Sequence, residues 1–116
     1  TGCSTGVDLW AADIVIELRR QNKELKLICA VPFEGFDSKW PVDWVKHYKM
    51  VRKQADWVEI ISPSYSPEAY QKRNMWMCRH ASRIIAVWDG LPSGTQNTID
   101  YAKEIGLVVK IIEVQK

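Results

Sequence analysis

Two glycine-bracketed turns carry the residues best suited to binding chemistry. The first spans residues 2–8 (Gly-Cys-Ser-Thr-Gly-Val-Asp), where two glycines four positions apart enclose small hydroxyl side chains before a helical pattern. Small side chains let a ligand approach the backbone, and the N–H groups of a first helical turn favour an anion such as phosphate. An ordinary tight turn, with Ser4 or Thr5 as N-cap and Asp8 favoured by the helix dipole, explains the same residues equally well.

The second turn, residues 89–98 (Asp-Gly-Leu-Pro-Ser-Gly-Thr-Gln-Asn-Thr), repeats this design between a strand pattern and the last helical pattern. Loops at the carboxyl ends of parallel strands converge on one crevice, the usual ligand position in open α/β sheets. This convergence favours the hypothesis that the two turns bind a ligand over the hypothesis that they are unrelated structural turns. Neither turn contains GK[ST] or GxGxxG, which disfavours a P-loop NTPase and a standard dinucleotide fold.

A helical pattern over residues 70–80 places Arg73 and Asn74 in mid-helix among basic and apolar neighbours. A solvated basic face is the commoner fate of such charges. An inward Arg73 would instead need an anionic partner. With a ligand bound, that partner could be a phosphate held by two hydrogen bonds; without ligand, it could be Asp8 or Asp89. We therefore expect Arg73 to point toward the crevice.

The elements that position these residues alternate along the chain. Helical spacing covers residues 7–20, 41–55, 66–80 and 96–105, and short Val- and Ile-rich segments cover 25–31, 58–62, 83–88 and 108–114. This order predicts an α/β, Rossmann-like three-layer domain with a mostly parallel sheet. The first three strands are expected to be buried on both faces, and the last to lie nearer an edge.

The six tryptophans suggest base stacking, but packing is the stronger interpretation for most of them. Trp40, at a loop–helix junction, is the best candidate for ligand or partner contact. The others fall at apolar helix or strand positions and are expected in the core: Trp10, Trp44, Trp57, Trp76 and Trp88.

Length and composition narrow the function classes. At 116 residues, with 47% hydrophobic and 26% charged residues, the sequence predicts one globular domain. A net charge of +2 gives no argument for nucleic acid or an anionic membrane as partner, and no apolar run is long enough to cross a bilayer. The three cysteines and two histidines are too dispersed to show the spacing of a metal-binding motif. The odd number of dispersed cysteines also favours a reduced, cytoplasmic setting.

The opening Thr1-Gly2 turn leads straight into a helix, whereas such a turn in an α/β fold normally follows a strand. We therefore expect residues 1–116 to be the carboxyl-terminal part of a larger domain. We also expect an open sheet edge that another chain covers or that promotes association into a homo-oligomer.

The order TGxxxGVDLWAA, PF after a strand, KRN on a helix, and AVWDGxxSGTxxTIDYA resembles the SLOG superfamily, and most closely its YpsA- and YoqJ-like bacterial members. The resemblance covers nearly the whole chain. It implies a Rossmann-like domain that binds a nucleotide or nucleotide-derived ligand, with no separate cofactor. It also implies a strand, loop, helix and second strand ahead of the TG turn, all four missing here.

Motifs and resemblance together give the candidate ligand- and phosphate-binding residues: Gly2, Cys3, Ser4, Gly6, Asp8, Arg73, Asn74, Asp89, Gly90, Ser93, Gly94 and Thr95.

The superfamily also holds the Lonely Guy phosphoribohydrolases, whose GGxGTxxE loop carries a catalytic Glu, and the DNA-processing protein DprA. In this sequence Thr98 stands at the position of that Glu. Because a carboxylate is the natural group to assist N-glycosidic cleavage, its absence favours a nucleotide-binding or sensing module without catalysis. A nucleoside-monophosphate phosphoribohydrolase using Arg73 with Asp8 or Asp89 is the alternative, and a DprA-like DNA-processing protein is a third.

Overall fold

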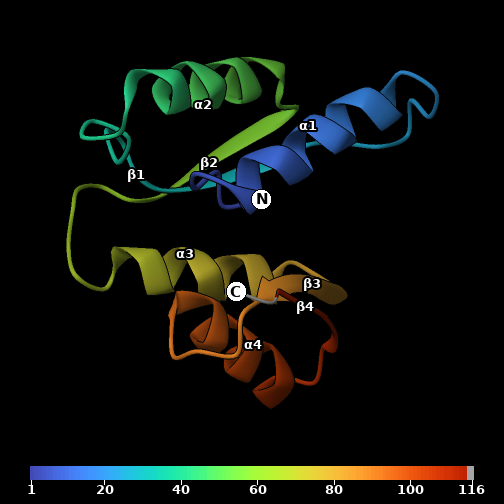
Figure 1. The fold of residues 1–116 in the computed structure, drawn as a ribbon, viewed down its shortest axis with the longest axis vertical. Coiled ribbons are helices and arrows are strands. Elements are labelled where there is room, and N and C mark those ends of the chain that lie inside the picture. The colour runs from blue at the N-terminus through green and yellow to red at the C-terminus, as the bar shows by residue number, and fades with distance from the viewer. Residues whose placement is uncertain (115–116) are drawn as a thin grey trace.

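The computed structural model describes residues 1–114, and its four helices alternate with four strands in the predicted order (Figure 1). The chain is therefore α/β, as its sequence predicts. The elements are α1 (Val7–Arg19), β1 (Ile28–Phe33), α2 (Val42–Gln54), β2 (Trp57–Ser62), α3 (Ala69–Arg79), β3 (Arg83–Trp88), α4 (Gly94–Glu104) and β4 (Val108–Glu113).

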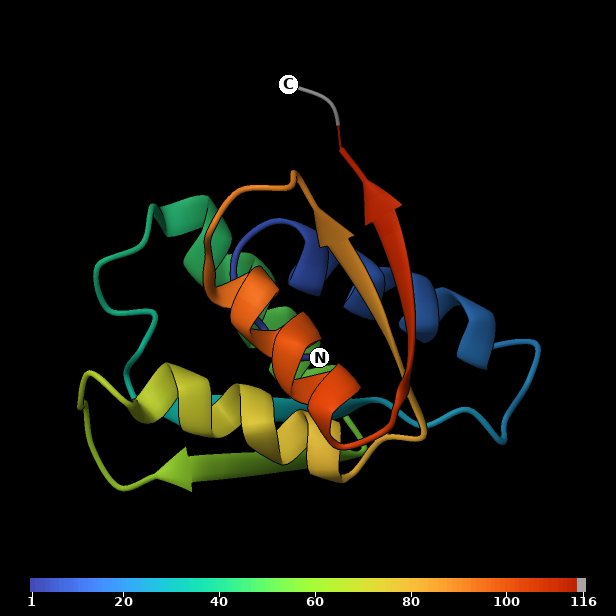
Figure 2. The same cartoon turned by 90° about the horizontal axis from the view of Figure 1, so that it is seen from below.

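The strands pair in parallel, as expected, but they form two separate sheets among the described residues. One sheet joins β1 to β2, with Cys29 opposite Val58, and the other joins β3 to β4, with Ala86 opposite Ile111. Figure 2 shows that β3 and β4 run at a large angle to β1 and β2. Neighbouring strands in one sheet differ in direction by only about 20–25°. In this structure β1 and β3 are therefore not neighbours in one continuous sheet.

Strand burial differs from the expectation for two of the first three strands. All but the first residue of β1 are buried, whereas β2 buries only Ser62 and β3 only Ala86. The buried core packs on β1, where it includes Cys29, Val31 and Phe33, whereas β2 contributes only the partly buried Val58 and Ile60.

The main core is centred on β1, where α1 and α2 pack together with a loop aromatic cluster. Phe36 lies at the centre of this aromatic cluster: its ring centroid is 4.8 Å from that of Trp40 and 5.2 Å from that of Tyr48. Burial raises the pKa of Tyr48 to about 12, so its hydroxyl stays neutral and accepts a hydrogen bond from Arg52 (3.1 Å). Trp40 thus packs on the core.

Two tryptophans predicted to be in the core are instead largely exposed. The exposed fraction is 55% for Trp10 and 59% for Trp57. Trp10 lies on the surface between two helices, where its ring packs on Trp44 at 6.0 Å. Trp57 begins the edge strand β2 and donates to Glu59 (2.9 Å). Helical and strand periodicity alone did not show that these faces lack a covering layer.

The Phe36 cluster should be a large contributor to stability. Phe36→Ala removes a 6%-exposed ring and leaves a cavity between Trp40 and Tyr48, so we expect a loss of about 3–5 kcal/mol in unfolding free energy. Chemical denaturation measures this loss. Leu91→Ala, at a side chain 50% exposed, is the control and should cost less than about 0.5 kcal/mol. Equal losses for the two variants would contradict the described core.

Candidate functional site

A pocket of about 690 Å³ brings both glycine turns together with α3 and β3. The first turn and the start of α1 form one wall, α3 a second, and β3 with the start of α4 a third. The lining residues are Ser4, Thr5, Val7, Asp8, Tyr70, Arg73, Asn74, Met77, Arg83, Ile84, Ile85, Ala86, Val87, Gly94, Thr95 and Thr98.

The first turn uses its own polar groups to hold its shape. The Asp8 side chain accepts from Ser4 N–H (3.2 Å), and Thr1 Oγ1 accepts from Cys3 N–H (3.3 Å) while donating to the Asp8 carbonyl (2.9 Å). Gly6 precedes α1 with φ 86°, a conformation that glycine adopts at little cost. The backbone N–H groups of Cys3 and Ser4 are therefore engaged within the turn.

Cys3 is the one member of this turn whose side chain is fully buried, and its backbone has φ 60°. A hydrogen bond with Cys29 and burial both raise the pKa of the Cys3 thiol, so it stays protonated. Cys3 thus belongs to the packing of the turn on β1 and does not line the pocket described above.

Arg73 is the most deeply placed polar side chain of the site, with 5% of its surface exposed. Its Nη1 donates to the carbonyl oxygens of Gly2 and Ala30, the latter at 3.4 Å, and its Nε donates to Asn74 Oδ1 (2.8 Å). Burial lowers the pKa of the guanidinium, and the nearby Asp8 carboxylate opposes that effect. Arg73 thus points inward and ties the first turn to β1 and α3.

The second turn opens α4 with groups that suit an anion. Ser93 is the N-cap: its Oγ accepts from Gln96 N–H (3.3 Å), and its carbonyl from Asn97 N–H (3.1 Å). Gly94 and Thr95 come just before these bonds, at positions whose N–H groups have no intrahelical acceptor. A Cβ built on Gly94 meets nothing within 4 Å, so the backbone there is open to the pocket.

Asp89 and Gly90 shape the second turn and are not among the pocket's lining residues. Asp89 Oδ1 accepts from Leu91 N–H (3.0 Å), Gly90 has φ 84°, and Trp88 Nε1 donates to the Leu91 carbonyl (2.7 Å). The twelve candidates thus fall into two groups. Six line the pocket (Ser4, Asp8, Arg73, Asn74, Gly94 and Thr95), and six support it from outside the lining (Gly2, Cys3, Gly6, Asp89, Gly90 and Ser93).

The candidate residues omitted Tyr70 and Met77, which also line the pocket. Their spacing gave a usable signal, because residues 70, 74 and 77 lie at i, i+4 and i+7 on one face of α3. Thr5 was part of the first motif without being selected. Residues 83–87 of β3 also line the pocket and were not among the candidate residues.

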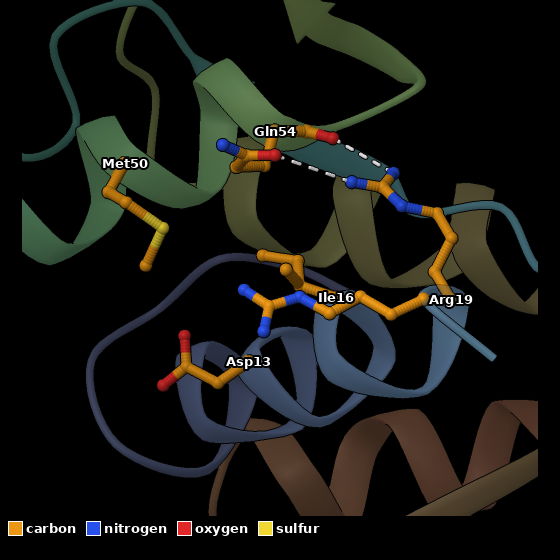
Figure 3. A pocket seen from close by; sticks show the side chains of 6 residues that line it. Asp13, Ile16, Arg19, Met50 and Gln54 are labelled. Atoms are coloured by element: carbon orange, nitrogen blue, oxygen red, sulfur yellow. Dashed lines mark hydrogen bonds between the residues drawn. The ribbon is translucent and has the colours of Figure 1, made fainter.

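A second hollow of about 420 Å³ lies between α1 and α2 (Figure 3). Arg19 on its wall donates to the Gln54 carbonyl (3.0 Å) and to Asp56 (2.8 Å), and Asp56 also accepts from Leu27 N–H (2.8 Å). This network joins the end of α1 to the starts of β1 and β2. The larger pocket is the one that joins both glycine turns with α3, so we place the candidate site there.

Gly2 and Arg73 should be energetically coupled because they are in direct contact. A Cβ added at Gly2 would lie 2.6 Å from Arg73 Nη1, so Gly2→Ala must displace the guanidinium and should lower the unfolding free energy by about 1–3 kcal/mol. In an Arg73→Ala background, the loss of unfolding free energy caused by Gly2→Ala should be smaller by about 1 kcal/mol or more. Denaturation of the four proteins of this double-mutant cycle measures the coupling. Additive effects would show that Arg73 does not hold the turn.

Comparison with known proteins places this chain in a family. Residues 1–107 match the YspA SLOG family. The chain is 36% identical to the SPbeta prophage-derived protein YoqJ of Bacillus subtilis (strain 168), covering 90% of this chain and 68% of that protein. It is 31% identical to a UPF0398 protein of Bacillus cereus (strain B4264), covering 87% of this chain and 56% of that protein. The chain therefore belongs to the YspA SLOG family.

Proposed function

We propose that the pocket binds a nucleotide or nucleotide-derived molecule and that the domain is a binding or sensing module without catalysis. The observation that carries the proposal is the meeting of both glycine turns with Arg73 and Asn74 in one pocket. The family resemblance suggests the nucleotide, and the pocket supplies the argument for where its phosphate and sugar would lie. No helix within residues 1–114 is long and apolar enough to span a membrane.

The phosphate is best accommodated at the start of α4. Two N–H groups of the first turn are bonded within that turn, whereas Gly94 and Thr95 open an 11-residue helix and line the pocket. The partial positive charge of a helix N-terminus favours an anion. The missing Cβ of Gly94 lets the anion reach the backbone. We therefore assign the phosphate to the amides of Gly94 and Thr95.

Two other lining residues, Asp8 at the start of α1 and Asn74 on α3, suit hydroxyl groups better than phosphate. Asp8 carries a carboxylate, which repels an anion and accepts hydrogen bonds from sugar hydroxyls. Asn74 already uses Oδ1 to accept from Arg73, so its amide nitrogen is the group that it offers to a ligand. The ligand would thus lie with its phosphate at α4 and its sugar toward Asp8 and Asn74.

The role proposed for Arg73 changes with this assignment. Its Nη1 and Nε are engaged by Gly2, Ala30 and Asn74, which makes it a positioning residue for the turn. Arg73 still lines the pocket, and its charge favours an anion there. Its direct bidentate contact with phosphate stays a prediction.

Hydrolysis is disfavoured by the chemistry at Thr98. This residue lines the pocket one helical turn after Gly94, and its hydroxyl donates to the Gly94 carbonyl (3.0 Å). It offers no carboxylate for proton transfer. Among the described lining residues Asp8 carries the one carboxylate, so a phosphoribohydrolase, the second candidate, would depend on Asp8. The DNA-processing alternative has only the superfamily resemblance behind it.

Gly94→Val tests the phosphate assignment directly. The new side chain has room in the protein and would stand beside the proposed anion, so we expect at least a tenfold loss of affinity for purine nucleoside monophosphates. Calorimetry on the intact natural polypeptide measures it. The matched control Ser93→Ala removes the N-cap bond and should lower stability by about 0.5–2 kcal/mol while leaving affinity nearly unchanged. Unchanged affinity in Gly94→Val would show that the second turn does not bind the phosphate.

Base release should be absent or very slow in the unmodified natural polypeptide. Incubation with purine nucleoside monophosphates, followed by chromatography for the liberated base, measures it. Thr98→Glu places a carboxylate on the pocket wall and should raise base release above that background, with Thr98→Gln as the uncharged control. Clear hydrolysis by the unmodified protein, abolished by Asp8→Asn, would instead favour the phosphoribohydrolase.

A further inference from the structure

Tyr70 is the one aromatic side chain among the described residues that line the large pocket. It lies in the first turn of α3 and keeps 39% of its surface exposed. The carboxyl ends of β1 and β2 lie on the same side of the molecule as this turn (Figure 1). In open α/β folds, ligands bind beyond the carboxyl ends of the strands. The Tyr70 ring is therefore accessible on the side where a ligand is expected.

The Tyr70 ring is held in place by buried neighbours. Its centroid lies 5.7 Å from that of Phe33, the last residue of β1, with 88° between the ring planes. Phe33 is 9% exposed and belongs to the main core. Arg73 Cζ lies 6.0 Å from the Tyr70 centroid, within range of a cation–π attraction that also restrains the ring. A tyrosine with so few bonds left to immobilise binds another ring at a low cost in conformational entropy.

The order of residues along α3 places Tyr70 beyond the proposed sugar position. Cys78 Sγ donates to the Thr98 carbonyl (3.9 Å), so α4 contacts α3 near the end of α3. At 1.5 Å per residue, Tyr70 lies about 12 Å before Cys78 along the helix. Asn74, which we place beside the sugar, lies halfway between them. Tyr70 thus follows Asn74 on the pocket wall, as counted from the contact with α4.

The covalent order of a nucleotide matches this order in space. In a nucleoside 5′-monophosphate, the ribose joins the phosphate on one side to the base on the other. With the phosphate at the start of α4 and the sugar at Asp8 and Asn74, the base falls beyond the sugar, toward Tyr70. Every base has a π-face that can stack on an aromatic side chain.

We propose that Tyr70 is the stacking platform for the nucleobase of the ligand, and that this contact makes the site select nucleoside monophosphates over sugar phosphates. The proposal rests on the proposed function, because it takes the phosphate and sugar positions from it. Ribose 5-phosphate fills those two positions and leaves the exposed part of the Tyr70 ring in water. A nucleoside monophosphate also covers that ring, which adds the burial of aromatic surface. The base contact is therefore what separates the two ligand classes.

Tyr65 provides a matched comparison for Tyr70. Its ring also lies across Phe33, with centroids 5.6 Å apart and 78° between the ring planes, and it is 66% exposed. Tyr65 is not among the lining residues of the large pocket. If Tyr70 did no more than cover Phe33, replacing either tyrosine would change ligand affinity in the same way.

Calorimetry of the natural polypeptide with adenosine 5′-monophosphate and, separately, with ribose 5-phosphate tests the proposal. The unmodified protein should bind the monophosphate at least about fivefold more tightly than ribose 5-phosphate. Tyr70→Leu keeps an apolar contact with Phe33 and a good helix former, so it should remove most of this preference by weakening the binding of the monophosphate alone. Tyr70→Phe, which keeps the aromatic face, and Tyr65→Leu should bind both compounds within about twofold of the unmodified protein.

Three results would overturn the platform. Unchanged affinity of Tyr70→Leu for adenosine 5′-monophosphate would remove the stacking contact. Equal losses for both compounds would describe a side chain that only shapes the pocket, and an equal loss in Tyr65→Leu would assign the effect to packing on Phe33. The phosphate assignment stands in these cases if the amides of Gly94 and Thr95 shift with both compounds. Absence of binding by either compound would overturn the proposed function and the platform together.

Discussion

The arrangement of the pocket depends on one buried cation. Arg73 is 5% exposed and donates to two backbone carbonyls from separate parts of the chain, Gly2 in the first turn and Ala30 in β1. An unpaired guanidinium in that position would cost several kcal/mol, so the turn and strand must stay where their carbonyls satisfy it. Gly2 must also be glycine-sized, because a Cβ would meet Arg73 Nη1 at 2.6 Å. Side chain and backbone thus fix each other.

The rest of the site follows from this anchor. With Gly2 held, the first turn closes on itself through Asp8, and Asn74 is oriented by the bond from Arg73 Nε. The second turn has a different construction: Ser93 caps α4, and a Cβ built on Gly94 would meet nothing within 4 Å. In the first turn the N–H groups of Cys3 and Ser4 are thus bonded internally, whereas the backbone at Gly94 has room beside it. This difference, more than the similarity of the two glycine motifs, is the basis for proposing an anion site at the start of α4.

Sequence reasoning succeeded where local patterns suffice. Helix–strand alternation, parallel pairing and the inward position of Arg73 all followed from periodicity and spacing. It failed where a partner element decides the outcome. Trp10 and Trp57 occupy positions with the spacing of apolar residues, but no other element covers them. Trp40 packs on Phe36, a loop residue whose position no periodic pattern predicts. The sequence likewise did not reveal that Arg73 would bond to backbone carbonyls, because those acceptors come from the folded turn and strand.

The central claim is that the start of α4 receives the phosphate of a nucleotide-like ligand. Amide chemical shifts of the natural polypeptide, titrated with a purine nucleoside monophosphate and separately with the matching nucleoside, test this most directly. The account predicts saturable shifts at Gly94 and Thr95 with the monophosphate, and much smaller shifts there with the nucleoside. Equal shifts with both compounds, or saturable binding that leaves Gly94 and Thr95 unmoved, would contradict it.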